Sequence, residues 1–185
     1  AAGIDPKSTS LRTLIAAGET YTEGTRREIE KMFDTTVYDH YGLAEVNTGI
    51  AYECEYQNGM HILDSYVYAE VLDGGMPVKV GESGELVLTS LQKEASPIIR
   101  YRTGDRVINL GEQTCPCGRK TSMVSRIQGR IDSVVSIKGV KVDPYELRSK
   151  LQEKFPDAIK DGVCTFLIEK NRIDYVPELL LPSED

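Results

Sequence analysis

The segment GELVLTSLQKEASPIIRYRTGDRVINL, residues 84–110, alternates apolar and polar side chains along several short runs. A period of two is typical of β-strands that bury one face, so GELVLTSL, PIIRY and DRVINL are predicted to be strands. The same alternation continues upstream in TGIAYEC and SYVYAEVL, which begin at Thr48 and Ser65, with DGG and GES as turns. These runs predict a sheet-rich, barrel-like block over about residues 48–110.

Two helices are predicted outside this block. Thr20 or Thr22 can cap a helix over about residues 23–33, because a hydroxyl at the N-cap accepts a hydrogen bond from a first-turn amide. Asp143 as an N-cap, with Pro144 in the first turn, predicts the start of a second helix.

Further short strands are predicted in TTVY at 35–38 and GVCTFLIEK at 162–170, whereas the tail ELLLPSED is expected to be loose. Because helices and strands are mixed along the chain, the predicted fold class is α/β in the broad sense that includes α+β.

The composition excludes several kinds of partner. The chain has 185 residues and a formal net charge of −7, and its few Lys and Arg residues are scattered, so no nucleic-acid partner is expected. No apolar run approaches membrane-spanning length, and the first residues show no signal-peptide pattern. Four cysteines are too few for a disulfide scaffold in a chain of this length, so a reducing, cytoplasmic location is expected.

The cysteines Cys115 and Cys117 are separated by one proline in TCPCGR, residues 114–119. Such a pair can be a redox couple, half of a disulfide framework or half of a metal site. A C-x-C turn can direct two thiolates at one zinc ion about 2.3 Å away, and four-coordinate zinc then needs two more ligands.

Cys54 and His61 are the best candidates for those two ligands. They flank a turn signal, Asn58-Gly59, which could bring both onto one side of a hairpin. Cys164 lies in an apolar run, where a buried structural thiol is the simpler interpretation. From these residues alone, a pair of exposed thiols with a surface histidine remains an equal alternative.

Three longer motifs occur in a fixed order: YDHYGLAE at 38–45, YRTGD at 101–105 and RIQGRIDSVVSIKGVKVDPYELRSKL at 126–151. With GIDPKSTSLRTLIAAGE at the start, they resemble the adenylate-forming ligases. The resemblance is strongest to the phenylacetate–CoA ligase-like branch, which also contains synthetases that adenylate a deazaflavin coenzyme. It extends over nearly the whole chain up to about residue 155.

The resemblance also bears on the cysteines. Some members of this branch hold a structural zinc at positions that match Cys54, His61, Cys115 and Cys117. A closed tetrahedral site of this kind would join two loops and would take no part in catalysis.

The resemblance implies a reaction in two halves, in which a carboxylate is first adenylated by ATP and coenzyme A then displaces AMP. The implied partners are ATP, coenzyme A, a small or aromatic carboxylic acid and the remainder of the enzyme; a homodimer is compatible with it.

For the nucleotide, the resemblance assigns Tyr41 to the adenine face, with Asp39 and Gly42 lining the same pocket. It assigns Glu45 to Mg²⁺, which prefers carboxylate oxygen. Ala44 precedes Glu45 where the family usually has Thr, so a hydroxyl that could meet the phosphate is missing. Asp105 matches the ribose ligand.

Arg130 matches an arginine that reaches ribose or phosphate, where its planar fork suits pairs of oxygen atoms. Asp132 matches the hinge between the large domain and the small mobile one. Gly139 matches a segment that approaches the pantetheine arm, and Gly18 and Glu19 match a stretch near the adenine and acyl pocket.

Two parts of the family's machinery have no match in this sequence: a Ser/Thr/Gly-rich phosphate loop and a lysine near the end of the small domain. Because electrostatic stabilisation of the transferring group is a large catalytic contribution, we expect the chain alone to be inactive as a ligase. Residues 1–131 would be the C-terminal part of the large AMP-binding domain, and residues 132–185 the start of the small one. The alternatives are AMP transfer to a non-acyl acceptor and a non-catalytic, zinc-stapled module that binds nucleotide or protein.

Overall fold

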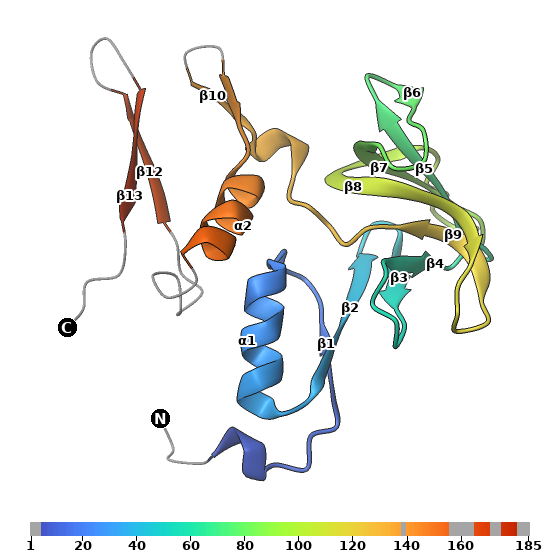
Figure 1. Cartoon of the computed structure of the whole chain (residues 1–185). Helices are drawn as coiled ribbons and strands as arrows, with labels where there is room; N and C mark the ends of the chain where they lie inside the picture. Colours follow the sequence, from blue (N-terminus) through green and yellow to red (C-terminus); the bar gives the residue numbers. More distant parts are fainter. Residues whose placement is uncertain (1–4, 138–139, 156–164, 171–174, 181–185) are drawn as a thin grey trace. The chain divides into compact units, whose positions relative to one another are not determined.

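The computed structural model describes residues 5–137, 140–155, 165–170 and 175–180 (Figure 1). The chain divides into two compact units, and each is described by itself. The first comprises residues 1–20 and 30–131, and the second comprises residues 21–29 and 132–185.

The first unit contains one sheet, which has nine strands among the described residues. Its order is β1-β2-β3-β4-β9-β8-β7-β5-β6, and only β1 and β2 are paired in parallel. The strands are β1 (Thr13–Ala16), β2 (Thr36–Leu43), β3 (Asn47–Glu53), β4 (Met60–Ile62), β5 (Val67–Asp73), β6 (Met76–Pro77), β7 (Ser83–Ser90), β8 (Tyr101–Thr114) and β9 (Lys120–Val124).

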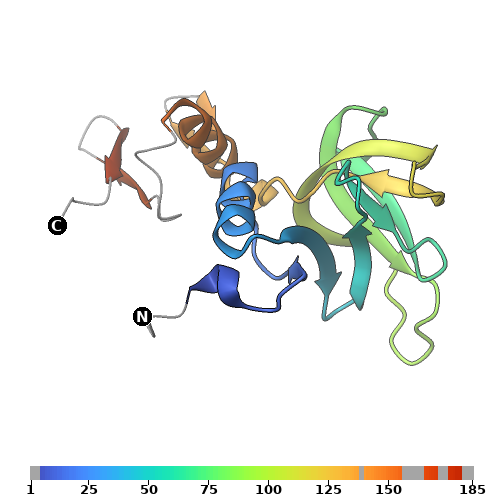
Figure 2. The ribbon, with the colours of Figure 1, turned by 60° about the horizontal axis from the view of Figure 1, so that its bottom comes forward.

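The long strand β8 joins the two halves of this sheet. Its first part pairs with β7 up to Ile108, and its second part pairs with β9 from Asn109 onward. Both views of the ribbon show β8 bending along its length between these partners (Figures 1 and 2). Register shifts at Glu85/Val87 and Asn109/Gly111 accompany the bend, as expected of β-bulges, which increase local twist.

The larger of two apolar clusters among the described residues lies against this sheet. The fully buried members come from most of its strands, because inward-facing side chains alternate with outward-facing ones along each strand. They include Ile50, Met60, Leu86, Leu88 and Val107, none of which is measurably exposed.

The strands predicted from TGIAYEC, SYVYAEVL, GELVLTSL and DRVINL are confirmed as β3, β5, β7 and part of β8. The strand predicted from PIIRY is wrong before Tyr101. Ile99 is 75% exposed and Arg100 has a φ of 49°, so the backbone turns there, and of the two isoleucines in this run Ile98 packs against the core whereas Ile99 does not. The strands β1 and β9 were not predicted.

The predicted helices are confirmed as α1 (Glu23–Phe33) and α2 (Pro144–Lys154). At the start of α1, Thr22 Oγ1 accepts a hydrogen bond of 3.3 Å from the amide of Thr25. Asp143 caps α2, because its carboxylate accepts from the amides of Tyr145 and Glu146. Among the described residues, no helix is both long enough and apolar enough to cross a membrane.

The second unit also contains two antiparallel hairpins, β10 (Val135–Ile137) with β11 (Val140–Val142), and β12 (Thr165–Lys170) with β13 (Tyr175–Leu180). The strand predicted at 162–170 is confirmed over the part that is β12. The expectation of a loose tail is wrong for residues 178–180, which belong to β13. Two short 3₁₀ turns, η1 (Pro6–Ser8) and η2 (Ile131–Ser133), complete the described elements.

Candidate functional site

The four residues Cys54, His61, Cys115 and Cys117 meet in the first unit, and their candidate ligand atoms all lie within 4.8 Å of one another. Cys54 directly follows β3, and His61 lies in β4. The two other cysteines occupy the turn between β8 and β9. Because β4 pairs with β3 on one side and with β9 on the other, residues about sixty positions apart are brought together.

The spacing within this Cys₃His cluster fits a tetrahedral metal site. Cys54 Sγ lies 3.7 Å from Cys115 Sγ, and Cys117 Sγ lies 3.5 Å from His61 Nε2. A tetrahedron with metal–sulfur arms of about 2.3 Å has corners about 3.8 Å apart. Cys54, Cys115 and Cys117 are free thiols. The 3.7 Å between Cys54 Sγ and Cys115 Sγ is far longer than a disulfide bond, so these two residues are not bridged.

The histidine is oriented by a neighbour. His61 Nδ1 lies 2.8 Å from Thr121 Oγ1, which leaves Nε2 facing the thiols. A hydrogen bond to the second ring nitrogen is the usual way in which a metal-binding imidazole is held in place. Burial lowers the pKa of His61 below its ordinary value, which favours the neutral ring that a metal requires.

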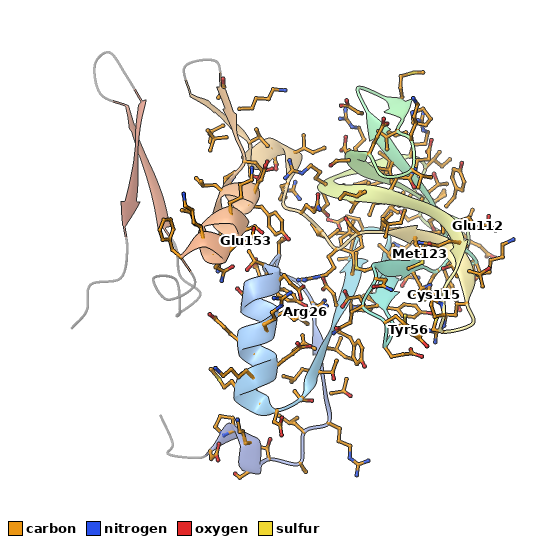
Figure 3. All side chains as sticks on the ribbon, viewed as in Figure 1. Arg26, Tyr56, Glu112, Cys115, Met123 and Glu153 are labelled. Atoms are coloured by element: carbon orange, nitrogen blue, oxygen red, sulfur yellow. The ribbon has the colours of Figure 1, made fainter. Side chains whose placement is uncertain are left out.

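The thiols of the cluster differ in acidity. Burial raises the pKa of the Cys54 thiol to about 11, whereas the backbone amide of Arg119 lowers the pKa of the Cys117 thiol. Cys115 is 5% exposed and packs with Met123 and Leu110 at this end of the sheet (Figure 3). The thiol of Cys117 therefore ionises more readily than that of Cys54, which would need a cation beside it to ionise.

A second group of predicted residues meets between β2 and β8. The hydroxyl of Tyr41 donates a hydrogen bond of 2.7 Å to Asp105 Oδ2, although the two residues are 64 positions apart. They are only 8% and 7% exposed. Burial, with the neighbouring carboxylate, raises the pKa of Tyr41 well above its ordinary value, so the hydroxyl keeps its proton and acts as the donor.

Arg130 completes this group from the segment after β9. Its guanidinium lies 3.4 Å from Asp105 Oδ1 and 3.3 Å from the carbonyl oxygen of Thr103, to which it donates. Gly104 has a φ of 75°, and a Cβ there would lie 2.7 Å from Arg130 Nη2. The glycine of the YRTGD motif is therefore favoured by its backbone conformation, and the arginine beside it would have to move to admit a side chain.

The chain is similar to several known ligases. No protein-family model matches the sequence. Over 153 residues the chain is 39% identical to the phenylacetate-coenzyme A ligase of Escherichia coli (strain K12) and 35% identical to that of Thermus thermophilus. Each match covers 80% of this chain and 34% of the relative. A solved 2-hydroxyisobutyryl-CoA ligase in complex with R3-HIB-AMP matches with a TM-score of 0.81 and 29% identity, over 96% of this chain and 38% of that one.

The chain belongs to the adenylate-forming ligase superfamily, in its phenylacetate–CoA ligase-like branch. It spans about a third of the length of the curated ligases that it matches.

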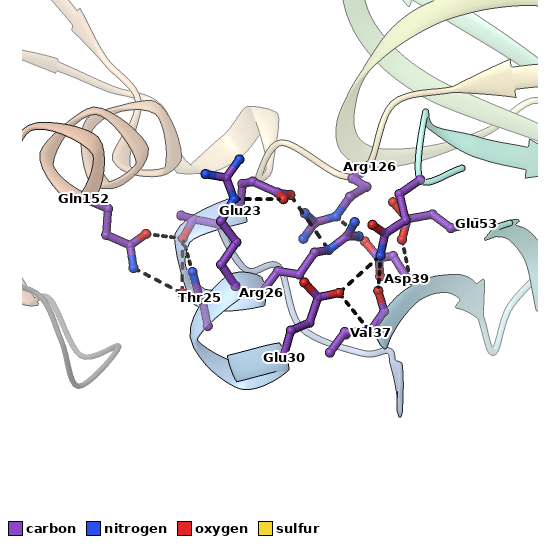
Figure 4. Close-up of polar contacts among 12 residues, drawn as sticks. Glu23, Thr25, Arg26, Glu30, Val37, Asp39, Glu53, Arg126 and Gln152 are labelled. Atoms are coloured by element: carbon purple, nitrogen blue, oxygen red, sulfur yellow. Dashed lines mark hydrogen bonds and ion pairs between the residues drawn. The ribbon is translucent and has the colours of Figure 1, made fainter. Parts of the chain in front are cut away.

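Asp39 is paired with Arg126, the first residue of the motif at 126–151, for which no role was predicted from the sequence. Arg126 Nε lies 3.0 Å from Asp39 Oδ2, and both side chains are about nine-tenths buried. The backbone amide of Asp39 donates to Glu53 Oε2 at 2.7 Å (Figure 4). Arg126 could have been suspected only from its position four residues before Arg130.

Gly42, in the same ligase motif, is explained by the backbone. A Cβ at Gly42 would lie 1.9 Å from the carbonyl oxygen of Thr48, at the point where the register between β2 and β3 shifts. The exposed Glu45 follows in the turn after β2, and its carbonyl oxygen accepts from Lys93 Nζ at 2.6 Å.

The remaining predicted residues of the ligase motifs lie elsewhere. Gly18 and Glu19 are exposed in the segment after β1 and, like Glu45, are not part of the hydrogen-bonded group of Tyr41, Asp105 and Arg130. Asp132 lies in η2. Gly139 lies outside the described residues.

Proposed function

We propose that this chain is part of an ATP-dependent acyl–CoA ligase that adenylates a small or aromatic carboxylic acid and then forms its thioester with coenzyme A. The observation that carries the proposal is the hydrogen-bonded group of Tyr41, Asp105 and Arg130. Three separate motifs contribute one polar side chain each to this group, and the curated relatives are named as ligases of this kind.

In this proposal Asp105 accepts hydrogen bonds from the ribose hydroxyls, as an ionised carboxylate does well. Tyr41 presents its ring to adenine while its hydroxyl holds Asp105 in place. Arg130 faces the same carboxylate and offers further donors to ribose or phosphate oxygens. Glu45 would bind Mg²⁺, and Asp39 and Gly42 would line the nucleotide pocket.

The same proposal divides the chain at the boundary after Ile131. Residues 1–131, with their barrel-like sheet, would form the end of the large AMP-binding domain, and residues 132–185 the start of the small mobile one. Asp132 would be the hinge, and Gly139 would approach coenzyme A. Gly18 and Glu19 would lie near the adenine and acyl pocket.

The Cys₃His cluster would hold a structural zinc ion. The donor set is that of closed four-ligand sites, and it leaves no open position for substrate. Such an ion supplies cross-linking and neutralises the thiolates. The residues around it orient the histidine and close the turn that carries two of the cysteines.

A chimera tests the ligase proposal. In the E. coli phenylacetate-coenzyme A ligase, this chain would replace the third of the enzyme to which it aligns, and pyrophosphate release with phenylacetate and ATP would be measured. We expect turnover by the chimera and its loss on Asp105→Asn, whereas Glu82→Gln, a change in an exposed turn, should leave it unchanged.

A folded chimera that releases no pyrophosphate, or one that is indifferent to Asp105→Asn, would contradict the proposal. Pyrophosphate release without thioester formation would favour AMP transfer to a non-acyl acceptor instead.

A further inference from the structure

Glu85 in β7 is a buried carboxylate whose role none of the motifs explains. The residue is 6% exposed and lies where the register between β7 and β8 shifts. Its Oε2 accepts from Nε and Nη2 of Arg102, and its Oε1 accepts from the backbone amide of Gly104 at 3.2 Å. The Glu85 carboxylate therefore binds both the Arg102 side chain and the Gly104 backbone within the YRTGD motif.

Leu86, the next residue of β7, holds the same part of β8 through its carbonyl oxygen. The hydroxyl of Thr103 donates to the carbonyl oxygen of Leu86 at 2.7 Å, and the amide of Asp105 donates to Thr103 Oγ1 at 3.0 Å. Two consecutive positions of β7 thus anchor Arg102, Thr103 and Gly104 of β8. The next residue, Asp105, carries the carboxylate that meets Tyr41 and Arg130.

The ion pair with Arg102 does not by itself account for a buried carboxylate. Arg102 is 76% exposed, and pairs with so exposed a partner contribute little to stability because water and salt screen them. The chain offers a comparison in Glu70, which binds Nε and Nη2 of Arg100 and, within the described part of the chain, makes no hydrogen bond to residues 102–105. What distinguishes Glu85 is its hydrogen bond to the amide of Gly104.

We propose that Glu85 is a positioning residue of the nucleotide site, which holds residues 102–105 of β8 so that the Asp105 carboxylate faces Tyr41 and Arg130. This inference rests on the proposed function for its consequence in nucleotide binding. Its structural part, the control of the contact between Tyr41 and Asp105, stands independently of that function.

The experiment compares Glu85→Gln with Glu70→Gln in the 185-residue chain, because each removes one carboxylate that is paired with an arginine on the same sheet. The first readout is the proton NMR signal of the Tyr41 hydroxyl, assigned by its loss in Tyr41→Phe. The proton of a buried hydroxyl that donates to a carboxylate exchanges slowly with water, so its signal can be sought at a downfield chemical shift. The second readout is AMP affinity by calorimetry.

We expect Glu85→Gln to shift or abolish the hydroxyl signal and to weaken AMP binding by about tenfold, the effect of losing one hydrogen bond that involves a charged group. Glu70→Gln should change neither readout. A Glu85→Gln chain that keeps the hydroxyl signal of the parent, or a Glu70→Gln chain that loses it equally, would overturn the proposal.

If Glu85→Gln does not fold, Glu85→Asp gives the same test, since it keeps the charge but is one methylene too short to reach both Arg102 and Gly104. If the parent chain binds no AMP, nucleotide binding by this chain is rejected. The hydroxyl signal then decides the role of Glu85 on its own.

Discussion

At the scale of single residues, a backbone contact can decide which side chain is allowed. Gly42 occupies a position where the carbonyl oxygen of Thr48 leaves no space for a Cβ, whereas a Cβ at Gly49 would meet only side-chain atoms at 3.7 and 3.9 Å. The sequence alone does not distinguish these two glycines, because the difference arises from the register between β2 and β3.

We therefore expect Gly42→Ala to lower the free energy of unfolding by about 3 kcal/mol, since the backbone must move to admit the methyl group. Gly49→Ala should change it by less than about 1 kcal/mol, because contacts of that length are ordinary packing. Urea denaturation of both variants measures the difference. Equal midpoints for the two variants would contradict the geometry of the bulge after Tyr41.

At the scale of elements, polar side chains hold the strand that carries Tyr41. Asp39 in β2 is tied to Arg126 after β9, and its amide is tied to Glu53 in β3. The amide of Val37 donates to Glu30 Oε1 at 3.0 Å (Figure 4). These contacts join β2 to the preceding helix, to the next strand and to the segment after β9, and so fix the position of the YDHYGLAE motif on the sheet.

Arg126→Ala should therefore destabilise the chain by about 3 kcal/mol, because it leaves the carboxylate of Asp39 buried without its arginine. The matched change is Arg100→Ala, which breaks the more exposed pair with Glu70 and should cost less than about 1 kcal/mol. Chemical denaturation of both variants measures their free energies of unfolding. A cost for Arg126→Ala no larger than that for Arg100→Ala would show that the pair with Asp39 is not an effective link.

At the scale of the whole molecule, the Cys₃His cluster joins the β3–β4 hairpin to the β8–β9 hairpin. We expect the purified chain to contain one zinc ion per molecule and Cys115→Ser to contain far less, because a closed site that loses one of four ligands binds its metal weakly. A chelator should lower the melting temperature of the parent. Elemental analysis and thermal unfolding measure these two effects.

Cys164→Ser is the matched control for the zinc site, because this cysteine is not one of the four proposed ligands, and it should retain the metal. A parent chain without zinc, or a Cys115→Ser chain with unchanged zinc content, would contradict the site.

Some residues of the candidate sites could be named from the sequence, whereas others depend on the order of strands in the sheet. Residue types left the Cys₃His cluster as one of two equal alternatives, and the resemblance to adenylate-forming ligases favoured it. The same resemblance named Tyr41, Asp105 and Arg130, which the structure brings together. Arg126 and Glu85 were missed because their partners follow from the order of strands in the sheet and from a bulge, neither of which leaves a local pattern. The strand expected at 97–100 is wrong because the backbone turns at Arg100, a conformation that the residue types there do not reveal.

The change of partner along β8 has a further consequence. Asp105 lies in the part that pairs with β7, while Cys115 directly follows the part that pairs with β9. Removal of the predicted zinc ion should therefore loosen the pairing of β8 with β9, while the pairing of β8 with β7 stays intact. Amide hydrogens of one continuous strand would then exchange at two distinct rates.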